Sequence, residues 1–209
     1  MMIAHPGILL HQVDGVVDPG CICEDVVMRA GRPLHEGCLM RWFWIDRYEE
    51  FVRCKRAVAL KAVSLAEEHL HDHFPGAAVM PTSLVIEGIA QAAGLLVIDA
   101  IDYARQVVLA KVAKAEFRFD ALPGDVIRYE VEIEELGESV SIVKATSSIG
   151  GRPHGEAELV FGHLVEGEMV PKLMSKAELM EWLDALRVFE VGTEPDGSPI
   201  IYDRLPHVT

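Results

Sequence analysis

The stretch SLVIEGIAQAAGLLVIDAIDYARQ, residues 83–106, decides the fold, because it is apolar on almost every side and rich in Ala and Leu. This pattern predicts a helix that is buried on most of its faces. Its length would also span a bilayer, but Glu87, Asp99 and Asp102 lie within it, and charged groups are costly at the centre of a membrane. We therefore expect a core helix and no membrane span.

Strand-like segments flank this helix in the sequence. Residues 56–65 precede it, and several later segments alternate apolar and polar residues, which is typical of strands with one face in water. Short connections rich in Gly and Pro, of which residues 122–125 are the first, indicate that consecutive strands are antiparallel neighbours. An apolar helix that covers one face of such a sheet gives an α+β fold class. The expected later strands are residues 107–119, 125–136, 139–149 and 156–165.

The remaining residues are expected to flank one domain at 41–165. Residues 1–40 show no clean period and predict an irregular N-terminal arm. Residues 166–209 predict a linker, a short helix and a tail. The helix is expected after the capping-box pattern Ser175–Glu178, because apolar residues follow it at helical spacing.

The amino-acid composition limits which binding partners and which cellular compartment we expect. The 209 residues carry 19 Lys and Arg against 33 Asp and Glu, a net charge of −14, which disfavours nucleic acid as a partner. Residues 1–10 contain no Lys or Arg and predict no signal peptide, so we expect a cytoplasmic protein. All four cysteines lie within the first 54 residues. Cys21 and Cys23 could begin a metal site, but no second pair follows at zinc-finger spacing, which favours incidental thiols.

The run His69-Leu70-His71-Asp72-His73 places histidines at alternate positions. In a strand they would face one side and could bind zinc or iron. The run is one residue short of the His-x-His-x-Asp-His pattern of metallo-hydrolases, and Pro75-Gly76 follows at once, which argues against a strand. A metal-dependent hydrolase is therefore one alternative, and exposed polar residues beside a cleft are the simpler interpretation.

His73 and Glu87 form a second candidate site. A histidine is a ready base near neutral pH, and apolar surroundings in the helix would favour the neutral, proton-donating form of Glu87. The first N–H groups of the helix, near Thr82 and Ser83, have no partner within the helix and could stabilise an oxyanion. These groups suffice to remove a proton next to a carbonyl and expel a β-hydroxyl. The residues alone leave equally open that His73 braces a turn and that Glu87 is a satisfied polar residue.

The residues around His73 and Glu87 form a specific sequence motif. The run His73-Phe74-Pro75-Gly76-Ala77-Ala78-Val79-Met80-Pro81, followed by Glu87-Gly88-Ile89-Ala90-Gln91, resembles the signature of the (3R)-hydroxyacyl-acyl-carrier-protein dehydratases. The resemblance covers about residues 41–164, with further similar pieces at Trp42–Arg47, Phe117–Phe119 and Pro123–Asp125. It implies a hot-dog fold, in which an antiparallel sheet wraps a long central helix.

The resemblance also implies roles. His73 would remove the α-proton, Glu87 of a second subunit would protonate the departing β-hydroxyl, and the N–H of Thr82 would bind the thioester carbonyl. The implied assembly is a homodimer with shared sites, with a trimer of dimers as an extension, and no metal or organic cofactor is implied. Gln91 lies one turn after Glu87 and is expected to orient its carboxyl. The acyl chain is expected in an apolar tunnel lined by Phe74, Met80 and Leu84.

Three departures from the family pattern keep other functions open. Thr82 stands where Gly is usual, Ala78 where Pro is usual, and Asp72 where a small residue is usual beside the histidine. The alternatives are a hot-dog thioesterase, a polyketide-type dehydratase, and a catalytically silent subunit that binds acyl chains. The substrate would be carried on acyl carrier protein or coenzyme A. The candidate basic contacts for an acidic carrier protein are Arg105, Lys111, Lys114 and Arg118.

Overall fold

The computed structural model describes residues 43–164 and 176–201. The predicted N-terminal arm, the linker and the final residues 202–209 therefore lie outside the described part of the chain. The described elements are β1 (Arg47–Val52), β2 (Arg56–Ala62), α1 (His69–Asp72), α2 (Thr82–Ala100), β3 (Gln106–Phe117), β4 (Val126–Leu136), β5 (Val140–Ile149), β6 (Arg152–Leu164), α3 (Lys176–Ala185), α4 (Val188–Val191) and β7 (Gly192–Thr193).

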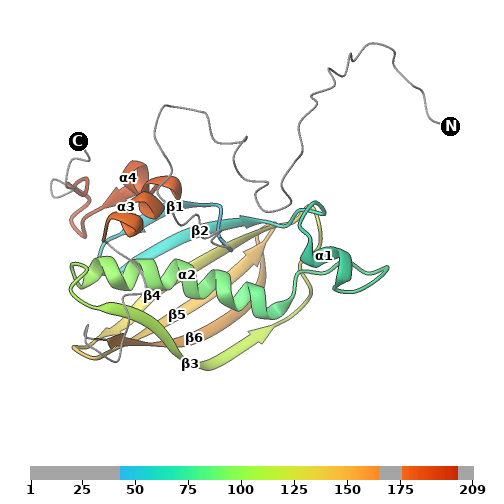
Figure 1. Cartoon of the computed structure of the whole chain (residues 1–209), viewed down its shortest axis with the longest axis horizontal. Coiled ribbons are helices and arrows are strands. Elements are labelled where there is room, and N and C mark those ends of the chain that lie inside the picture. The colour runs from blue at the N-terminus through green and yellow to red at the C-terminus, as the bar shows by residue number, and fades with distance from the viewer. Residues whose placement is uncertain (1–42, 165–175, 202–209) are drawn as a thin grey trace, which may run out of the picture. The chain divides into compact units, whose positions relative to one another are not determined.

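The long helix α2 lies across one face of a seven-stranded sheet (Figure 1). The strands run in the order β3-β6-β5-β4-β2-β1-β7, and every neighbouring pair is antiparallel except β1 with β7. Buried and exposed residues alternate along β4 and β5, as expected for strands that have one face on α2 and the other in water. This arrangement is the hot-dog fold, which confirms the predicted fold class.

The expected pairing of consecutive strands is correct from β4 to β6 but wrong for β3 and β4. β3 pairs with β6 at the edge of the sheet, so that β5 and β6 lie between β3 and β4. Residues 118–125 consequently cross one end of the sheet. Their backbone groups bond to neighbouring loops, with Met80 N–H donating to the Ala121 carbonyl at 2.9 Å and Val63 N–H to the Asp125 carbonyl at 2.9 Å. These contacts replace the internal hydrogen bonds that a hairpin would have supplied.

The helix α2 ends at Ala100, although the apolar run that predicted it continues to residue 106. Asp102 and Tyr103 have φ values of 54° and 59°, in the left-handed region that ends a helix. Gln106 already belongs to β3. Apolar character alone did not mark this change from helix to strand, because both elements are partly buried.

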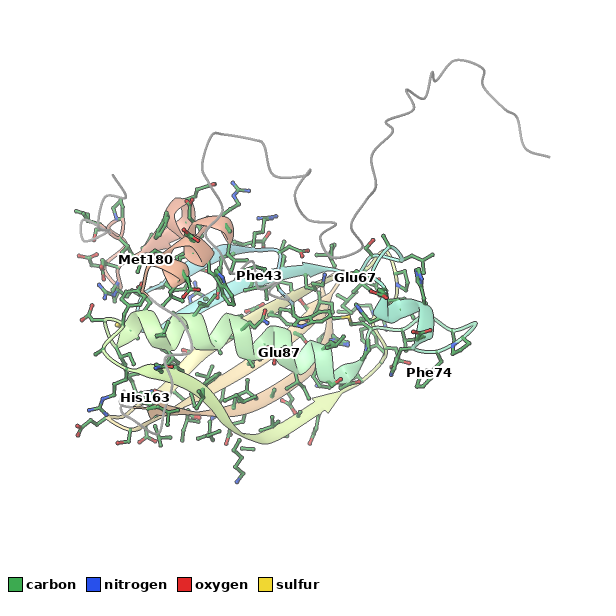
Figure 2. The ribbon with its side chains drawn as sticks, viewed as in Figure 1. Phe43, Glu67, Phe74, Glu87, His163 and Met180 are labelled. Atoms are coloured by element: carbon green, nitrogen blue, oxygen red, sulfur yellow. The ribbon has the colours of Figure 1, made fainter. Side chains whose placement is uncertain are left out.

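The C-terminal residues form more structure than the predicted tail. α3 matches the expected amphipathic helix, and Met180, labelled in Figure 2, is buried on it together with Leu183. The capping pattern that begins at Ser175 starts outside the described residues. After α3, Tyr48 N–H donates to the Leu186 carbonyl at 2.9 Å, and β7 pairs in parallel with β1. The open edge of β1 therefore binds the segment that was expected to be a tail.

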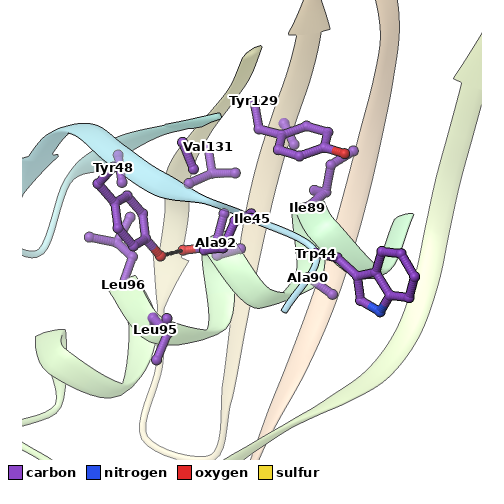
Figure 3. Packing of buried hydrophobic residues seen from close by; sticks show 14 of the residues in the cluster. Trp44, Ile45, Tyr48, Ile89, Ala90, Ala92, Leu95, Leu96, Tyr129 and Val131 are labelled. Atoms are coloured by element: carbon purple, nitrogen blue, oxygen red, sulfur yellow. Dashed lines mark hydrogen bonds between the residues drawn. The ribbon is translucent and has the colours of Figure 1, made fainter. Parts of the chain in front are cut away.

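The core lies between α2 and the sheet (Figure 3). Tyr48 of β1 is fully buried, and its hydroxyl donates to the Ala92 carbonyl of α2 at 2.9 Å. Small residues such as Ala92 and Ala93 allow the helix to approach the strands closely. By length and composition α2 would also pass for a membrane span, and core helices pass the same test. Here its burial against the sheet is that of a core helix.

Candidate functional site

The loop that carries His73 is a tight turn held by its own backbone. Phe74 and Ala77 exchange two hydrogen bonds of 3.0 and 2.9 Å, and Gly76 between them has a φ of 84° that favours glycine. Val79 N–H donates to the His73 carbonyl at 3.1 Å, and the His73 ring stacks on that of Phe74 with centroids 4.1 Å apart. The turn thereby fixes the imidazole, whose Nδ1 is buried without a hydrogen-bond partner among the described residues.

The helix α2 begins directly after this loop without a capping side chain. Its N-cap residue is Pro81, which offers no side-chain acceptor, and Thr82 and Ser83 are exposed. The first N–H groups of a helix lack intrahelical partners and carry partial positive charge. The start of α2 can therefore donate hydrogen bonds to an oxygen that develops negative charge.

Glu87 is held by a short relay of hydrogen bonds. Gln91 Nε2 donates to Glu87 Oε1 at 3.0 Å, and the Trp44 backbone N–H donates to Gln91 Oε1 at 2.8 Å. The amide of Gln91 is thus oriented by the backbone and in turn orients the carboxyl group. Glu87 itself is exposed in the single chain, so the expectation that it faces an apolar interior is wrong at this level of assembly. The reason is that this face of α2 turns away from the sheet.

A partly buried ion pair lies beside Trp44, whose ring centroid is 6.0 Å from Lys61 Nζ. Lys61 Nζ is 2.5 Å from Glu67 Oε1. Burial alone would raise the pKa of Glu67, but hydrogen bonds from Lys61 and from a backbone amide outweigh it and lower that pKa. His69 packs edge-on against Trp44 with ring centroids 5.1 Å apart. Burial lowers the pKa of His69, and the negative charge of Glu67 acts in the opposite direction. The positive charge of Lys61 lowers the pKa further, so the ring stays neutral at pH 7.

A groove of about 350 Å³ runs along α2 from Glu87 to Ile98. Of its twelve lining residues, only Glu87 and Gln91 carry a carboxyl or amide group. Residues 107–109 of β3 and Phe161 of β6 also line it. α3 contributes Leu179 and Trp182 to the lining. The groove therefore has a polar end at Glu87 and apolar walls beyond it.

The structure divides the predicted site residues into groups. Glu87 and Gln91 are joined on α2, and Thr82 begins the same helix. His73 lies on the loop between α1 and α2, directly before Phe74, which Figure 2 labels beyond the start of α2. Among the described residues, no hydrogen bond, ion pair or ring contact joins His73 to Glu87 within one chain.

The residues predicted to line the tunnel do not line this groove. Phe74 is 58% exposed at the loop, Met80 is buried in the core, and Leu84 is half-buried on the first turn of α2. Their tunnel role stays a prediction. In the single chain, the apolar surface next to Glu87 is built from other residues.

The histidine run forms no ladder, because His69–Asp72 is the short helix α1 and not a strand. His71 Nε2 lies 3.0 Å from the Leu65 carbonyl, whereas His69 packs on Trp44. Within residues 43–164 and 176–201, no three His, Cys, Asp or Glu side chains are grouped to hold a metal ion. Cys54, the cysteine in this part of the chain, is free and exposed.

The sequence alone did not mark Trp44, Leu179 or Trp182 as residues of the site. Trp44 acts through its backbone N–H, which is present in every residue except proline, so no residue type signals it. Leu179 and Trp182 did give a signal, since their spacing predicted an amphipathic helix. The sequence does not say against which part of the domain such a helix packs.

Residues 43–153 match the profile of the FabA-like domain. The 3-hydroxyacyl-acyl-carrier-protein dehydratase FabZ of Clostridium acetobutylicum is 36% identical over 118 residues, which cover 56% of this chain and 84% of that protein. FabZ of Desulforamulus reducens is 38% identical over 118 residues, covering 56% and 83%. Among solved structures, AziG of S. sahachiroi covers 57% of this chain and 91% of its own, at 15% identity and a TM-score of 0.49. The family assignment rests on the profile match and on the sequence identity to the two FabZ proteins.

Proposed function

The chain belongs to the family of FabA-like domains, and on that premise we propose that it removes water from (3R)-3-hydroxyacyl thioesters to give trans-2-enoyl thioesters. The observation that carries this proposal is the exposed Glu87 carboxyl, oriented by Gln91 at the polar end of an apolar groove. A thioester with a polar head and an apolar tail suits such a groove. The reaction would serve fatty-acid or related acyl synthesis.

The proposed chemistry needs one base, one acid and one oxyanion donor. His73 takes the proton from the α-carbon, and the electron pair of that C–H bond forms the double bond to the β-carbon. The bond from the β-carbon to its hydroxyl breaks, and the hydroxyl leaves as water with a proton from Glu87. The N–H of Thr82, at the uncapped start of α2, stabilises the charge on the thioester carbonyl. A proton returned from His73 to Glu87 restores the starting state.

A homodimer with shared sites is part of this proposal. β3 is a long edge strand in the single chain, with Leu109 39% and Val112 40% exposed. Exposed edges of this kind readily pair with another chain. We place the β3 strands of two copies side by side, with His73 of one copy acting with Glu87 of the other. A trimer of dimers is the larger assembly that a size measurement would test.

The proposed carrier of the acyl chain is acyl carrier protein, as in the names of the FabZ relatives, with coenzyme A as the alternative. Among the four candidate cations, Arg105 bonds to Glu138, and Lys114 bonds to Glu156. Lys111 and Arg118 make no ion pair with other described residues, and both are exposed. These two side chains are therefore the stronger candidates for contact with an acidic carrier.

The test measures enoyl-thioester formation by absorbance for the wild type, His73→Ala and Glu87→Gln. Each substitution is expected to lower kcat about 10²- to 10⁴-fold, because it removes the base or the acid. Mixing the two inactive variants and allowing subunits to exchange should restore activity, since each mixed dimer contains one site with both groups intact. Rates equal to wild type in both variants would refute the proposal.

Two further outcomes separate the alternatives. Free thiol released without an enoyl product would identify a thioesterase. Two inactive variants that gain nothing on mixing, although size measurements show subunit exchange, would mean that His73 and Glu87 do not act across the interface.

A further inference from the structure

We propose that α3 forms one wall of the acyl-binding groove, and that Leu179 and Trp182 set how strongly the protein holds long acyl chains. The inference rests on the proposed function for the identity of the ligand. α3 lies beyond residues 43–153, which match the family profile, so family membership alone does not supply this wall.

α3 has two faces with different surroundings. Met180 and Leu183 are 6% and 0% exposed and anchor the helix in the core. Leu179 and Trp182 lie three residues apart, which places them on one side of the helix, and both line the groove. Leu179 is only 4% exposed and also belongs to the core, whereas Trp182 is half-buried. The helix is therefore attached to the domain through its buried residues, and the side that carries Trp182 and Leu179 forms a wall of the groove.

A second contact fixes Trp182 near the reactive end of the groove. Its ring packs against Phe43 with centroids 4.6 Å apart and an interplanar angle of 61°. Phe43 directly precedes Trp44, whose N–H holds Gln91. The indole is thus positioned by the same segment that orients the amide next to Glu87. A chain that leaves the reacting carbons at Glu87 must pass this wall.

The chemistry of the groove fits an acyl chain. Its carboxyl and amide groups lie at Glu87 and Gln91, and the other lining side chains are apolar. From Glu87 to Ile98 the helix extends about 16 Å, which gives room for a chain to lie along it. Each methylene that is buried there should strengthen binding about fourfold. The wall contributed by Leu179 and Trp182 should therefore matter for long chains and not for short ones.

The experiment measures binding by titration calorimetry of butyryl-, octanoyl- and dodecanoyl-coenzyme A, saturated thioesters that cannot be dehydrated. The full-length proteins are the wild type, Leu179→Ala, Trp182→Ala, Trp182→Phe and the control Glu181→Ala on the exposed side of α3. Trp182→Ala should weaken dodecanoyl binding about tenfold and leave butyryl binding within about twofold. Leu179→Ala should show a smaller loss of the same kind.

Two control variants show whether a loss of binding comes from the groove wall itself. Glu181→Ala should bind like the wild type, and Trp182→Phe should retain most of the length dependence because it keeps an aromatic wall against Phe43. A loss that is equal for all three chain lengths would overturn the proposal, as would no loss in a folded Trp182→Ala protein. A changed dimer dissociation constant without a change in length dependence would show that a second copy fills the groove, which also overturns it.

This measurement separates the inference from the proposed function. Length-dependent acyl binding by a wild type that forms no enoyl product would leave the wall in place and remove the dehydratase. Dehydration with no effect of Leu179 or Trp182 on chain-length preference would leave the dehydratase and remove the wall.

Discussion

The polar groups at the two ends of α2 have opposite surroundings. At the start, Pro81 provides no cap, Thr82 is exposed, and Glu87 one turn later has its carboxyl in solvent. At the other end, Asp99 is fully buried, accepts a hydrogen bond from the Tyr103 hydroxyl, and lies 3.3 Å from Arg53 Nε. The first end is open to a ligand, and the second is closed by the protein's own groups.

The closed end also joins segments that are distant in the sequence. Arg53 follows β1, and its guanidinium contacts Asp102 after α2 and Glu194 after β7, in addition to Asp99. The Arg53 side chain therefore joins the β1–β2 hairpin, the central helix α2 and the C-terminal segment after β7. Charged groups paired in this way serve stability, whereas polar groups left open at the start of α2 are available for chemistry.

The largest expected effect on stability comes from removing the cation at the closed end. Arg53→Met leaves the buried Asp99 without its charged partner and should lower the free energy of unfolding by about 3 kcal/mol. Urea denaturation at pH 7 measures this loss. The control is Arg56→Met, whose ion pair with Glu50 lies at the surface and should contribute less than about 1 kcal/mol. Equal losses in the two variants would contradict the division of α2 into an open and a closed end.

A smaller effect is expected from two glycines of α2. A Cβ on Gly88 would lie 2.7 Å from the Trp44 carbonyl oxygen and 2.9 Å from the Tyr129 hydroxyl. Gly88→Ala should therefore destabilise the protein by about 2 kcal/mol and shift the segment that holds Gln91, which should also lower the proposed dehydratase activity. In Gly94→Ala the nearest contact is 3.5 Å, and the higher helix propensity of Ala should add up to about 1 kcal/mol of stability. Thermal unfolding of both variants tests this difference, and a stable Gly88→Ala protein would disprove the close packing.

The sequence was sufficient for the parts of the fold that depend on local pattern. The apolar run predicted α2, and the alternation of side chains predicted β4 and β5. The turn of Gly150 and Gly151, with φ values of 56° and 77°, closes the β5–β6 hairpin as a glycine pair predicts. The partner of β3 was not predictable in this way, because the choice between β4 and β6 depends on how residues 118–125 cross the sheet. β7 was missed because a two-residue strand has no periodicity.

The site shows the same division. His73, Glu87 and Gln91 were singled out because their side chains have the required chemistry, and the bond from Gln91 to Glu87 follows from helical spacing. The Trp44 amide and the wall formed by α3 are products of tertiary packing. The exposure of Glu87 was not foreseen either, because a helix that is apolar almost all round does not reveal which face turns away from the sheet.

The smallest expected effect concerns the response of the two ends to pH. Burial raises the pKa of Asp99, although the hydrogen bond from Tyr103 and the charge of Arg53 act against it. The folded protein therefore binds more protons than the unfolded chain as the pH rises above 3.8, so this carboxyl costs stability towards neutral pH. Glu67, near the open end, has a lowered pKa and the opposite sign. It adds stability above pH 4.5, and this contribution is lost as the pH falls through its folded value.

Substituting the two carboxyls separately tests these opposite signs. Asp99→Asn should equal the wild type or exceed it by up to about 1 kcal/mol at pH 7, because a neutral group replaces a buried charge, and this advantage should shrink as the pH approaches 4. Glu67→Gln should be less stable than the wild type at pH 7, with a deficit that also shrinks on acidification. Urea denaturation of both variants across this range provides the measurement. If Asp99→Asn were strongly destabilised at pH 7, the buried carboxylate would be worth more to the closed end in its charged form, and the pair with Arg53 would be a net source of stability.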